Sequence, residues 1–156
     1  MKVSEILKEN IIKVNLEAGD KTDSINKMID LANNSGKILN LEKVKECVFE
    51  REKLVSTGVG KGFAIPHGKT DDIADITASF AILKDSIDFD SIDSEKVKFI
   101  FLLVGKDSML NAHIKLLSRI SRLMNKDDFR DKLLSAKSET EVLTYFKEEE
   151  QNYIDI

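Results

Sequence analysis

Two histidines and one arginine stand where the surrounding sequence pattern does not predict them. Arg51 ends an apolar helical stripe, His113 begins another, and His67 lies in the segment "AIPHGK". Pro66 restricts the backbone on one side of His67, and Gly68 frees it on the other. The three residues are far apart in the sequence, so only the fold can bring them into one site.

These residue types are suited to carrying a phosphoryl group. A neutral imidazole is a nucleophile near neutral pH, because its ordinary pKa of about 6.5 leaves a ring nitrogen lone pair free. A phosphoryl group bound to His67 would carry roughly two negative charges and would need cations and N–H donors placed in advance. Arg51 is a planar, permanent cation, and His113 can donate a hydrogen bond or help to move protons. Further candidate donors begin the glycine-rich segment: Ser56, Thr57 and Gly58. Such a phosphohistidine site requires no metal and no cofactor.

Each candidate also has a purely structural interpretation that the sequence leaves open. His67 could be a turn histidine, and His113 could be a core histidine that bonds a backbone carbonyl. Arg51 could simply stabilise the negative C-terminal end of its helix. Ser56 and Thr57 could cap local backbone groups. A metal site is disfavoured, because no cluster of further ligand residues accompanies the two histidines.

Length and composition restrict the class of protein. The chain has 156 residues, of which 42% are apolar and 33% are charged, a balance typical of one globular domain. The longest apolar run, residues 99–104, is too short to span a bilayer. The start "MKVSEILKEN" lacks the apolar core of a secretory signal, so we expect a cytoplasmic protein. The net charge of −4 and the scattered basic residues argue against nucleic acid as the main partner.

The chain contains one cysteine, Cys47. An internal disulfide is therefore excluded, which is consistent with a cytoplasmic location. Cys47 falls on the apolar face of its predicted helix, so we expect a small buried hydrophobe rather than a member of the site.

Hydrophobic periodicity predicts alternating strands and helices, and hence a sheet flanked by helices. Residues 11–16 alternate like a strand, and Gly19 and Asp20 then open a helix that Gly36 closes. Residues 97–105 contain consecutive apolar residues, as expected of a strand covered on both faces. The other predicted elements are a helix at about 41–53, an irregular glycine-rich loop at 54–69, a strand at 76–84, an exposed connection up to 96, and three helices after residue 109.

Five segments of the chain together resemble one protein family. They are "ERE" (50–52), "STGVGKGFAIPHGK" (56–69), "FDSIDSEKVKFIFLLVG" (89–105), "AHIKLLSRISRLM" (112–124) and "DDFRDKLLSAKSETEVL" (127–143). The pattern "STG" followed by "G.AIPH" is specific to this family. The chain resembles the IIA component of the bacterial phosphotransferase system, fructose–mannitol type, to which the nitrogen-regulatory IIA proteins are related.

This resemblance covers roughly residues 3–147 and implies the fold. The implied architecture is α/β, an α/β/α sandwich around a central mixed β-sheet in a single domain. We expect that domain to occupy residues 1–156, with its core at about 3–147. An acidic C-terminal tail at 148–156 is expected to fray from the end of the last helix.

The resemblance also implies a phosphotransferase reaction. The residue matched by His67 accepts a phosphoryl group from phospho-HPr on Nε2 and passes it to a cysteine of a IIB component during sugar uptake. The membrane IIC component would be reached only indirectly. Arg51 and His113 match residues that line the pocket, and Ser56 and Thr57 match positions beside it.

A regulatory role is the alternative that the sequence leaves open. In nitrogen-type relatives the same histidine reports phosphorylation state, and the protein acts by binding other proteins. The sequence does not identify the sugar, the partner IIB component or the oligomeric state.

The reaction sets requirements for the geometry of the site. We expect a backbone or side-chain acceptor to fix Nδ1 of His67, which leaves Nε2 as the nucleophile. Because two partners must reach the phosphoryl group in turn, we expect a shallow site with modest contacts. Phe63 and Ile65 are the apolar side chains expected to surround it.

Overall fold

A mixed sheet of six strands runs through the centre of the structure, a computed structural model that describes residues 1–153. The strands are β1 (Ile12–Leu16), β2 (Gly58–Gly60), β3 (Phe63–Ala64), β4 (His67–Lys69), β5 (Thr77–Ile87) and β6 (Val97–Gly105). Their order is β1-β5-β6-β3-β2, and β4 also pairs with β6. Strands β5 and β6 are antiparallel, as are β2 and β3, and the other pairs are parallel.

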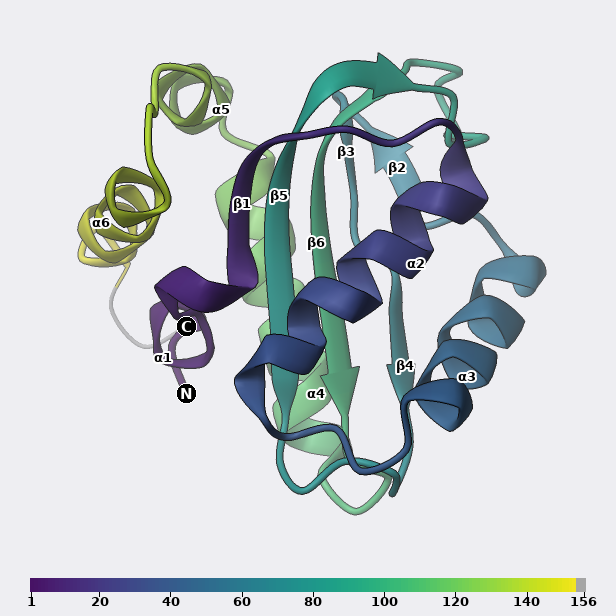
Figure 1. The fold of residues 1–156 in the computed structure, drawn as a ribbon. Coiled ribbons are helices and arrows are strands. Elements are labelled where there is room, and N and C mark those ends of the chain that lie inside the picture. The colour runs from purple at the N-terminus through teal and green to yellow at the C-terminus, as the bar shows by residue number, and fades with distance from the viewer. Residues whose placement is uncertain (154–156) are drawn as a thin grey trace.

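Helices cover both faces of this sheet. They are α1 (Val3–Ile6), α2 (Lys21–Ala32), α3 (Leu41–Leu54), α4 (Leu110–Met124), α5 (Asp127–Leu134) and α6 (Glu139–Glu150), with short 3-10 turns η1 (Glu9–Ile11) and η2 (Asn33–Ser35). Helices α2 and α3 lie in front of the sheet in Figure 1, and α4 lies behind it. The expected α/β/α sandwich is therefore confirmed. No helix within residues 1–153 is long and apolar enough to cross a bilayer.

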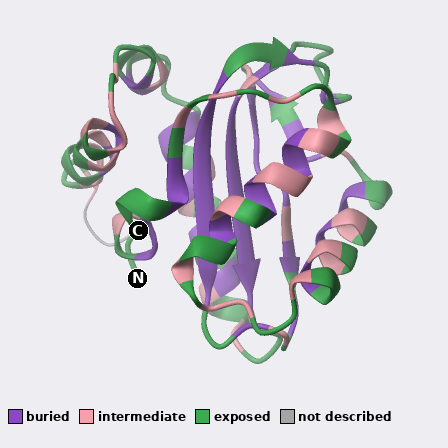
Figure 2. Ribbon diagram, viewed as in Figure 1, coloured by how far each residue is buried: buried purple, intermediate pink, exposed green. Residues whose placement is uncertain are grey.

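Strand β6 separates two apolar cores through its alternating side chains. Its odd-numbered residues from Phe99 to Leu103 join the core that includes α4 and α6. Its even-numbered residues from Ile100 to Val104 join the core that includes α2 and α3. Figure 2 shows β6 buried along almost its whole length, as its unbroken apolar run predicts. Strand β5 continues past its predicted end, because Ile87 is buried and pairs with β6.

The glycine-rich segment 54–69, expected to be irregular, instead contains three short strands. Strands β2 and β3 pair around residues 60–62, all of which have positive φ. Strand β4 runs parallel to β6 and places His67 opposite Leu103. Pro66 has no N–H group to donate, but its carbonyl accepts a hydrogen bond from the N–H of Leu103 at 3.1 Å. Pairing with β6 therefore fixes the backbone on both sides of the histidine.

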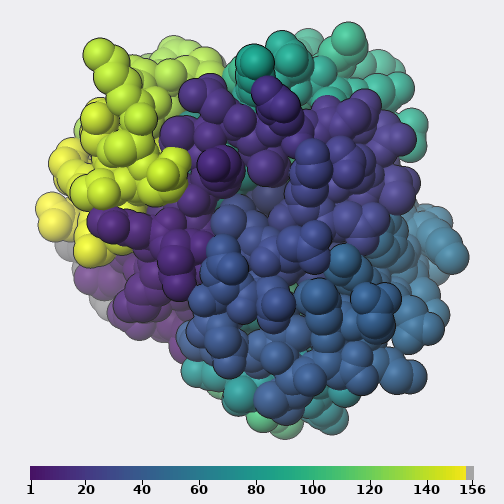
Figure 3. Space-filling view, in the orientation of Figure 1, coloured from purple at the N-terminus to yellow at the C-terminus, as the bar shows by residue number. Residues whose placement is uncertain are grey.

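Helix α6 holds the N-terminal segment through two glutamates. Glu139 accepts a hydrogen bond from the N–H of Val14, on the edge strand β1, at 3.0 Å. Glu150 accepts from the N–H groups of Val3 and Ser4, in the first turn of α1, at 2.6 and 2.7 Å. Figure 3 shows the N-terminal segment packed directly against α6.

The last turn of α6 lies in the region assigned from the sequence to an acidic tail. Residues 148–150 are helical, and Glu150 contacts α1. Phe146, after which fraying is expected, is fully buried, with its ring edge-on to Phe80 at a centroid distance of 5.0 Å. These contacts anchor the last turn to the domain. Residues 154–156 of the expected tail lie outside the described residues.

Replacing Glu150 by alanine should destabilise the protein by about 1 kcal/mol, because two backbone N–H groups at a helix start lose their acceptor. Urea unfolding measures the change. The matched control is Glu148→Ala, in the same turn, whose exposed carboxylate pairs with Lys132 at 3.0 Å. This variant should change stability by less than about 0.5 kcal/mol. Equal effects of the two variants would contradict the capping role.

Candidate active site

The structure brings Arg51, His67 and His113 together in one pocket of about 580 Å³. His67 comes from β4 at the edge of the sheet. Arg51 comes from the last turn of α3, which lies on one face of the sheet, and His113 from the first turn of α4, which lies on the other (Figure 1). The pocket therefore forms where both helical layers meet the sheet edge.

Nδ1 of the half-buried His67 ring lies 2.8 Å from the backbone carbonyl oxygen of Ile65. A carbonyl can only accept, so Nδ1 carries the hydrogen and Nε2 keeps its lone pair. The acceptor expected for Nδ1 is thus present. Burial lowers the pKa of His67, and Arg51 lowers it further, against the opposing effects of the Ile65 carbonyl and the Glu52 carboxylate. The ring is therefore neutral at pH 7 and carries its free lone pair on Nε2.

His113 is buried beside His67, with ring centroids 5.7 Å apart and an interplanar angle of 54°. Its Nδ1 atom is buried and has no hydrogen-bond partner among residues 1–153. The ring packs against Gly105, where a Cβ atom would lie 2.4 Å from Nδ1, so a larger residue would displace it. Because Nδ1 is enclosed and lacks a partner among the described residues, Nε2 is the nitrogen of this ring that is left to bond a ligand in the pocket.

Burial also determines the charge of His113. It lowers the pKa of His113 to about 4, and the charge that His67 carries when protonated and the charge of Lys69 act in the same direction. At neutral pH the ring is uncharged. It can therefore donate a hydrogen bond, whereas the positive charge of the pocket comes from other residues.

Arg51 both forms a hydrogen bond at the end of its own helix and lines the pocket. Its Nη1 donates a hydrogen bond to the carbonyl of Val55 at 3.0 Å, at the end of α3. This contact matches the structural interpretation, in which Arg51 stabilises the end of its helix. Arg51 also lines the pocket, and its charge acts on His67. The guanidinium thus supplies positive charge beside the His67 ring.

The apolar side chains around the pocket differ from those expected. Phe63 and Ile65 are only 1% and 6% exposed, so their prediction as a surface ring is wrong. Both side chains lie in the core that includes α4, because residues two apart along an extended chain share one face. The exposed apolar residues of the pocket are instead Leu54, Leu110 and Ile114, at 76%, 46% and 54% exposure.

Ser56, Thr57 and Gly58 are hydrogen-bonded within the protein. Ser56 Oγ donates to the carbonyl of Phe89 at 2.8 Å and accepts from the N–H of Gly58 at 3.1 Å. Thr57 donates from its N–H and from Oγ1 to the Glu52 carboxylate, at 2.8 and 2.6 Å. None of the three lines the pocket. Their phosphoryl-binding role stays a prediction, and it would require these bonds to open.

Cys47 lines the pocket and is only half-buried, so its prediction as a buried hydrophobe is wrong. Its Sγ donates to the carbonyl of Lys69 at 3.0 Å. Burial raises the pKa of the Cys47 thiol, which is therefore protonated at neutral pH. Gly68 allows helix α3 to approach β4 this closely, because any larger residue would place a Cβ atom only 2.7 Å from Sγ of Cys47.

Sequence reasoning missed several charged residues of this region, among them Lys69 and Glu52. Lys69 follows His67 by two positions on β4 and lines the same pocket. Strand periodicity could have found it, since side chains two residues apart share a face. Glu52 is buried and binds Thr57, and no pattern in the sequence distinguishes it from the exposed glutamates of the same helix.

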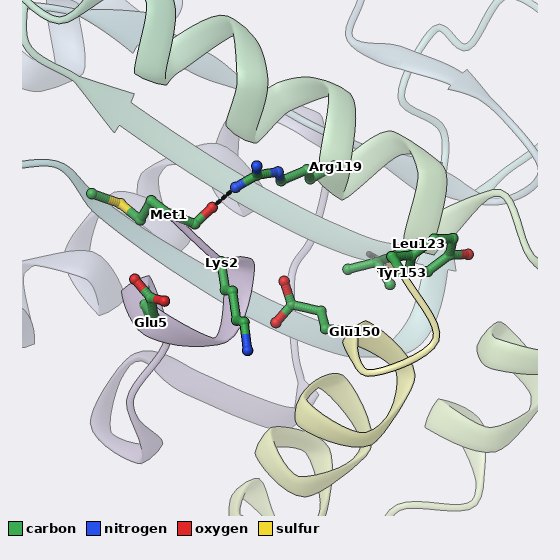
Figure 4. Close-up of a pocket in the computed structure, with 7 residues that line it drawn as sticks. All are labelled: Met1, Lys2, Glu5, Arg119, Leu123, Glu150 and Tyr153. Atoms are coloured by element: carbon green, nitrogen blue, oxygen red, sulfur yellow. Dashed lines mark hydrogen bonds between the residues drawn. The ribbon is translucent and has the colours of Figure 1, made fainter. Parts of the chain in front are cut away.

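A second pocket, of about 290 Å³, lies between α1, α4 and α6 and holds none of the predicted site residues. In Figure 4 the Arg119 side chain reaches from α4 to the carbonyl of Met1, to which it donates a hydrogen bond. Glu150 faces α1 from the other side and caps it. The charged groups of this pocket thus join the N-terminal segment to the two helices.

Residues 5–149 match the model of a protein family described as the phosphoenolpyruvate-dependent sugar phosphotransferase system, EIIA 2. The chain belongs to this EIIA family. Among its relatives, the fructose-specific EIIABC component of Bacillus subtilis is 34% identical over 143 residues, which are 92% of this chain. The EIIA chain spans 22% of that longer protein. The fructose-specific EIIA component of Haloferax volcanii is 33% identical over 140 residues, covering 90% of this chain and 91% of that protein. A nitrogen regulatory protein of Bradyrhizobium diazoefficiens is 41% identical over 98 residues, covering 63% of this chain and 64% of that protein.

Solved structures show the same fold as this EIIA chain. The nitrogen regulatory protein IIA-Ntr of Neisseria meningitidis superposes with a TM-score of 0.86 at 30% identity, covering 92% of this chain and 98% of that one. IIA mannitol of Escherichia coli, in a complex with phosphorylated IIB mannitol, superposes with a TM-score of 0.78 at 18% identity, covering 91% and 97%.

The charge states of the two histidines predict a pH dependence of this EIIA. His113 should titrate with a midpoint near pH 4, and His67 below its ordinary value of 6.5. In the unfolded chain His113 should bind a proton near pH 6.5. The free energy of unfolding that His113 contributes is therefore complete above about pH 6.5 and is lost as the pH falls toward 4.

Histidine NMR titrations measure the two midpoints, and urea unfolding at several pH values measures the stability. His113→Gln should flatten the slope of stability against pH between about 6.5 and 4, where one histidine contributes at most ~1.4 kcal/mol per pH unit. A His113 midpoint near 6.5 would contradict the buried, neutral ring.

Proposed function

We propose that this EIIA is a phosphoryl carrier that accepts a phosphoryl group from phospho-HPr on Nε2 of His67 and passes it to a cysteine of a IIB component during fructose- or mannitol-type sugar uptake. The observation that carries the proposal is the bond from Nδ1 of His67 to Ile65. It leaves Nε2 unprotonated in a pocket shared with Arg51 and His113. The family and its fructose-specific relatives support the same reaction.

In this mechanism Nε2 of His67 attacks the phosphorus of phospho-HPr in line. The new P–N bond forms as the P–N bond to HPr breaks, and the HPr imidazole leaves with the bonding electron pair. The hydrogen on Nδ1 stays on the ring, where the Ile65 carbonyl stabilises the positive charge that develops. In the second step a thiolate of IIB attacks the phosphorus, and Nε2 recovers its lone pair.

Two further residues act on the bound phosphoryl group. Arg51 supplies a permanent positive charge beside the two negative charges that arrive. His113 donates a hydrogen bond from Nε2–H, and the N-terminal end of α4 adds positive potential in the same place. Neither residue has to change its own protonation state for the transfer.

His67→Ala should abolish labelling of the protein by phosphoenolpyruvate, enzyme I and HPr, because the nucleophile is missing. His113→Ala should slow labelling by about 10- to 100-fold, as expected for one lost hydrogen bond to a charged group. Labelling with ³²P and an acid-lability test measure the result. Ser118→Ala, exposed on the outer side of α4, is the control and should label normally. Normal labelling of His67→Ala would refute the proposal.

Two partners should share one docking surface around the pocket. Leu54, Leu110 and Ile114 are exposed beside the histidines, so both phospho-HPr and IIB must cover them to reach Nε2. Chemical-shift mapping with each partner should give overlapping footprints that include these three residues. Separate footprints would contradict a single phosphoryl site that serves both partners.

A regulatory role of the nitrogen type is the second candidate. It is favoured by the 41% identity to a nitrogen regulatory protein and by the TM-score of 0.86 to IIA-Ntr. The two candidates differ in where the phosphoryl group goes. Labelled protein that transfers its group to a IIB component supports sugar uptake, whereas labelled protein that no IIB component unloads supports regulation.

A further inference from the structure

Glu52 is a buried charged residue with no part in the phosphoryl-transfer steps. It is only 7% exposed, and burying a carboxylate is costly unless donors surround it. Three donors do so: Thr57 N–H at 2.8 Å, Thr57 Oγ1 at 2.6 Å and Lys21 Nζ at 3.1 Å. Lys21 Nζ also lies 4.9 Å from the centroid of the Phe89 ring. Glu52 therefore joins α2, the end of α3 and the chain that leads to β2.

The bonds of Glu52 determine the path of the chain as it leaves α3. The helix ends at Val55 in an extended conformation, φ −155° and ψ 138°, without the left-handed residue that commonly closes a helix. Two residues later Thr57 is tied back to Glu52 by both of its donors. One end of the segment Val55–Thr57 is thus fixed by the helix, and the other end is fixed by the Glu52 carboxylate.

The carbonyl held in this way is the one that Arg51 binds. Arg51 Nη1 donates to the Val55 oxygen at 3.0 Å, and Arg51 precedes Glu52 directly in the helix. If the bonds between Glu52 and Thr57 opened, the Val55 carbonyl would be free to move, and the guanidinium would lose its fixed acceptor beside His67.

The charge of Glu52 also acts on the nucleophile. Glu52 and Arg51 change the proton affinity of His67 in opposite directions, with Glu52 favouring the protonated ring. Besides Arg51, the charged residues that line the pocket are Glu50, Lys69 and Asp107, and His113 is neutral. Glu52 lies outside this lining, yet its charge opposes the effect of Arg51 on the His67 ring.

We infer that Glu52 is a positioning residue, whose two bonds to Thr57 hold the Val55–Thr57 segment and thereby set the position of Arg51 beside His67. The inference rests on the proposed phosphoryl transfer at His67. It gives the "STG" motif a role different from direct phosphate binding, since Thr57 acts through Glu52 and Arg51. The two roles make different predictions for combined substitutions.

The test is a double-mutant cycle between Glu52→Gln and Thr57→Val, read as the rate of phosphoryl transfer from phospho-HPr. Each single variant should slow transfer about tenfold, which corresponds to ~1.4 kcal/mol. The double variant should be no slower than Glu52→Gln alone, because both changes break the same contact. Thr57→Ser keeps the hydroxyl donor and should restore the rate. Rate losses that multiply in the double variant would overturn the inference and indicate direct contact of Thr57 with the phosphoryl group.

NMR separates positioning from a general loss of stability. Thr57→Val keeps the charge of Glu52 but releases Arg51, whose positive charge lowers the pKa of His67, so the pKa of His67 should rise in this variant. The Arg51 Nε–H signal should shift in both Glu52→Gln and Thr57→Val. The control is Ser24→Ala, which removes a buried hydroxyl that donates to the Lys21 carbonyl at 2.7 Å, and it should change neither signal. An unchanged Arg51 signal in Thr57→Val would overturn the inference.

These measurements also separate this inference from the proposed function. If the wild-type protein is not labelled by phospho-HPr, the proposed function fails, and the Arg51 and His67 signals still test the positioning. If Glu52→Gln does not fold, the Arg51 signal in Thr57→Val decides between the two roles, because only positioning through Glu52 requires that signal to shift. Equal transfer rates in Thr57→Val and Thr57→Ser would also overturn the inference.

Discussion

The hydrogen bond from Nδ1 of His67 to the carbonyl of Ile65 is the interaction on which the site depends. It determines which ring nitrogen carries the hydrogen, and hence which one can act as nucleophile. The bond exists because Pro66 and His67 are both held against β6, one through its carbonyl and one in the ladder. A nucleophile defined by backbone geometry needs no second side chain to keep it in the reactive tautomer.

The pocket has little net charge of its own, so in the proposed transfer the phosphoryl group brings the negative charge. Both histidines are neutral at pH 7, because burial lowers the pKa of each. Among the charged residues of the lining, Arg51 and Lys69 are balanced by Glu50 and Asp107. In the proposed transfer, an arriving phosphoryl group therefore meets hydrogen-bond donors and two cations that are already in place.

The sequence predicted the fold and indicated three residues that the structure brings into one pocket, for identifiable reasons. The unbroken apolar run of β6 and the 3.6-residue stripes of the long helices are strong local signals. Arg51, His67 and His113 were found because each interrupts such a pattern. The resemblance to a known family then indicated that distant segments converge.

What the sequence could not show depends on contacts between segments. Phe63 and Ile65 looked like surface residues because β3 is only two residues long, too short for its alternation to be recognised. Glu52 resembles any helical glutamate until the fold places Thr57 and Lys21 around it. The helical end of α6 was missed for the same reason, since Glu150 has a partner only once α1 lies beside it.

The position of the pocket at the junction of three layers has a consequence for how the protein loses activity. One residue of the proposed site belongs to the sheet, one to the front helices and one to the rear helix. Detachment of either helical layer would separate the groups while the remaining core stayed packed. Phosphoryl acceptance should therefore decline with whichever layer opens first on heating, and it would report that opening before spectroscopic signals of the whole sheet respond.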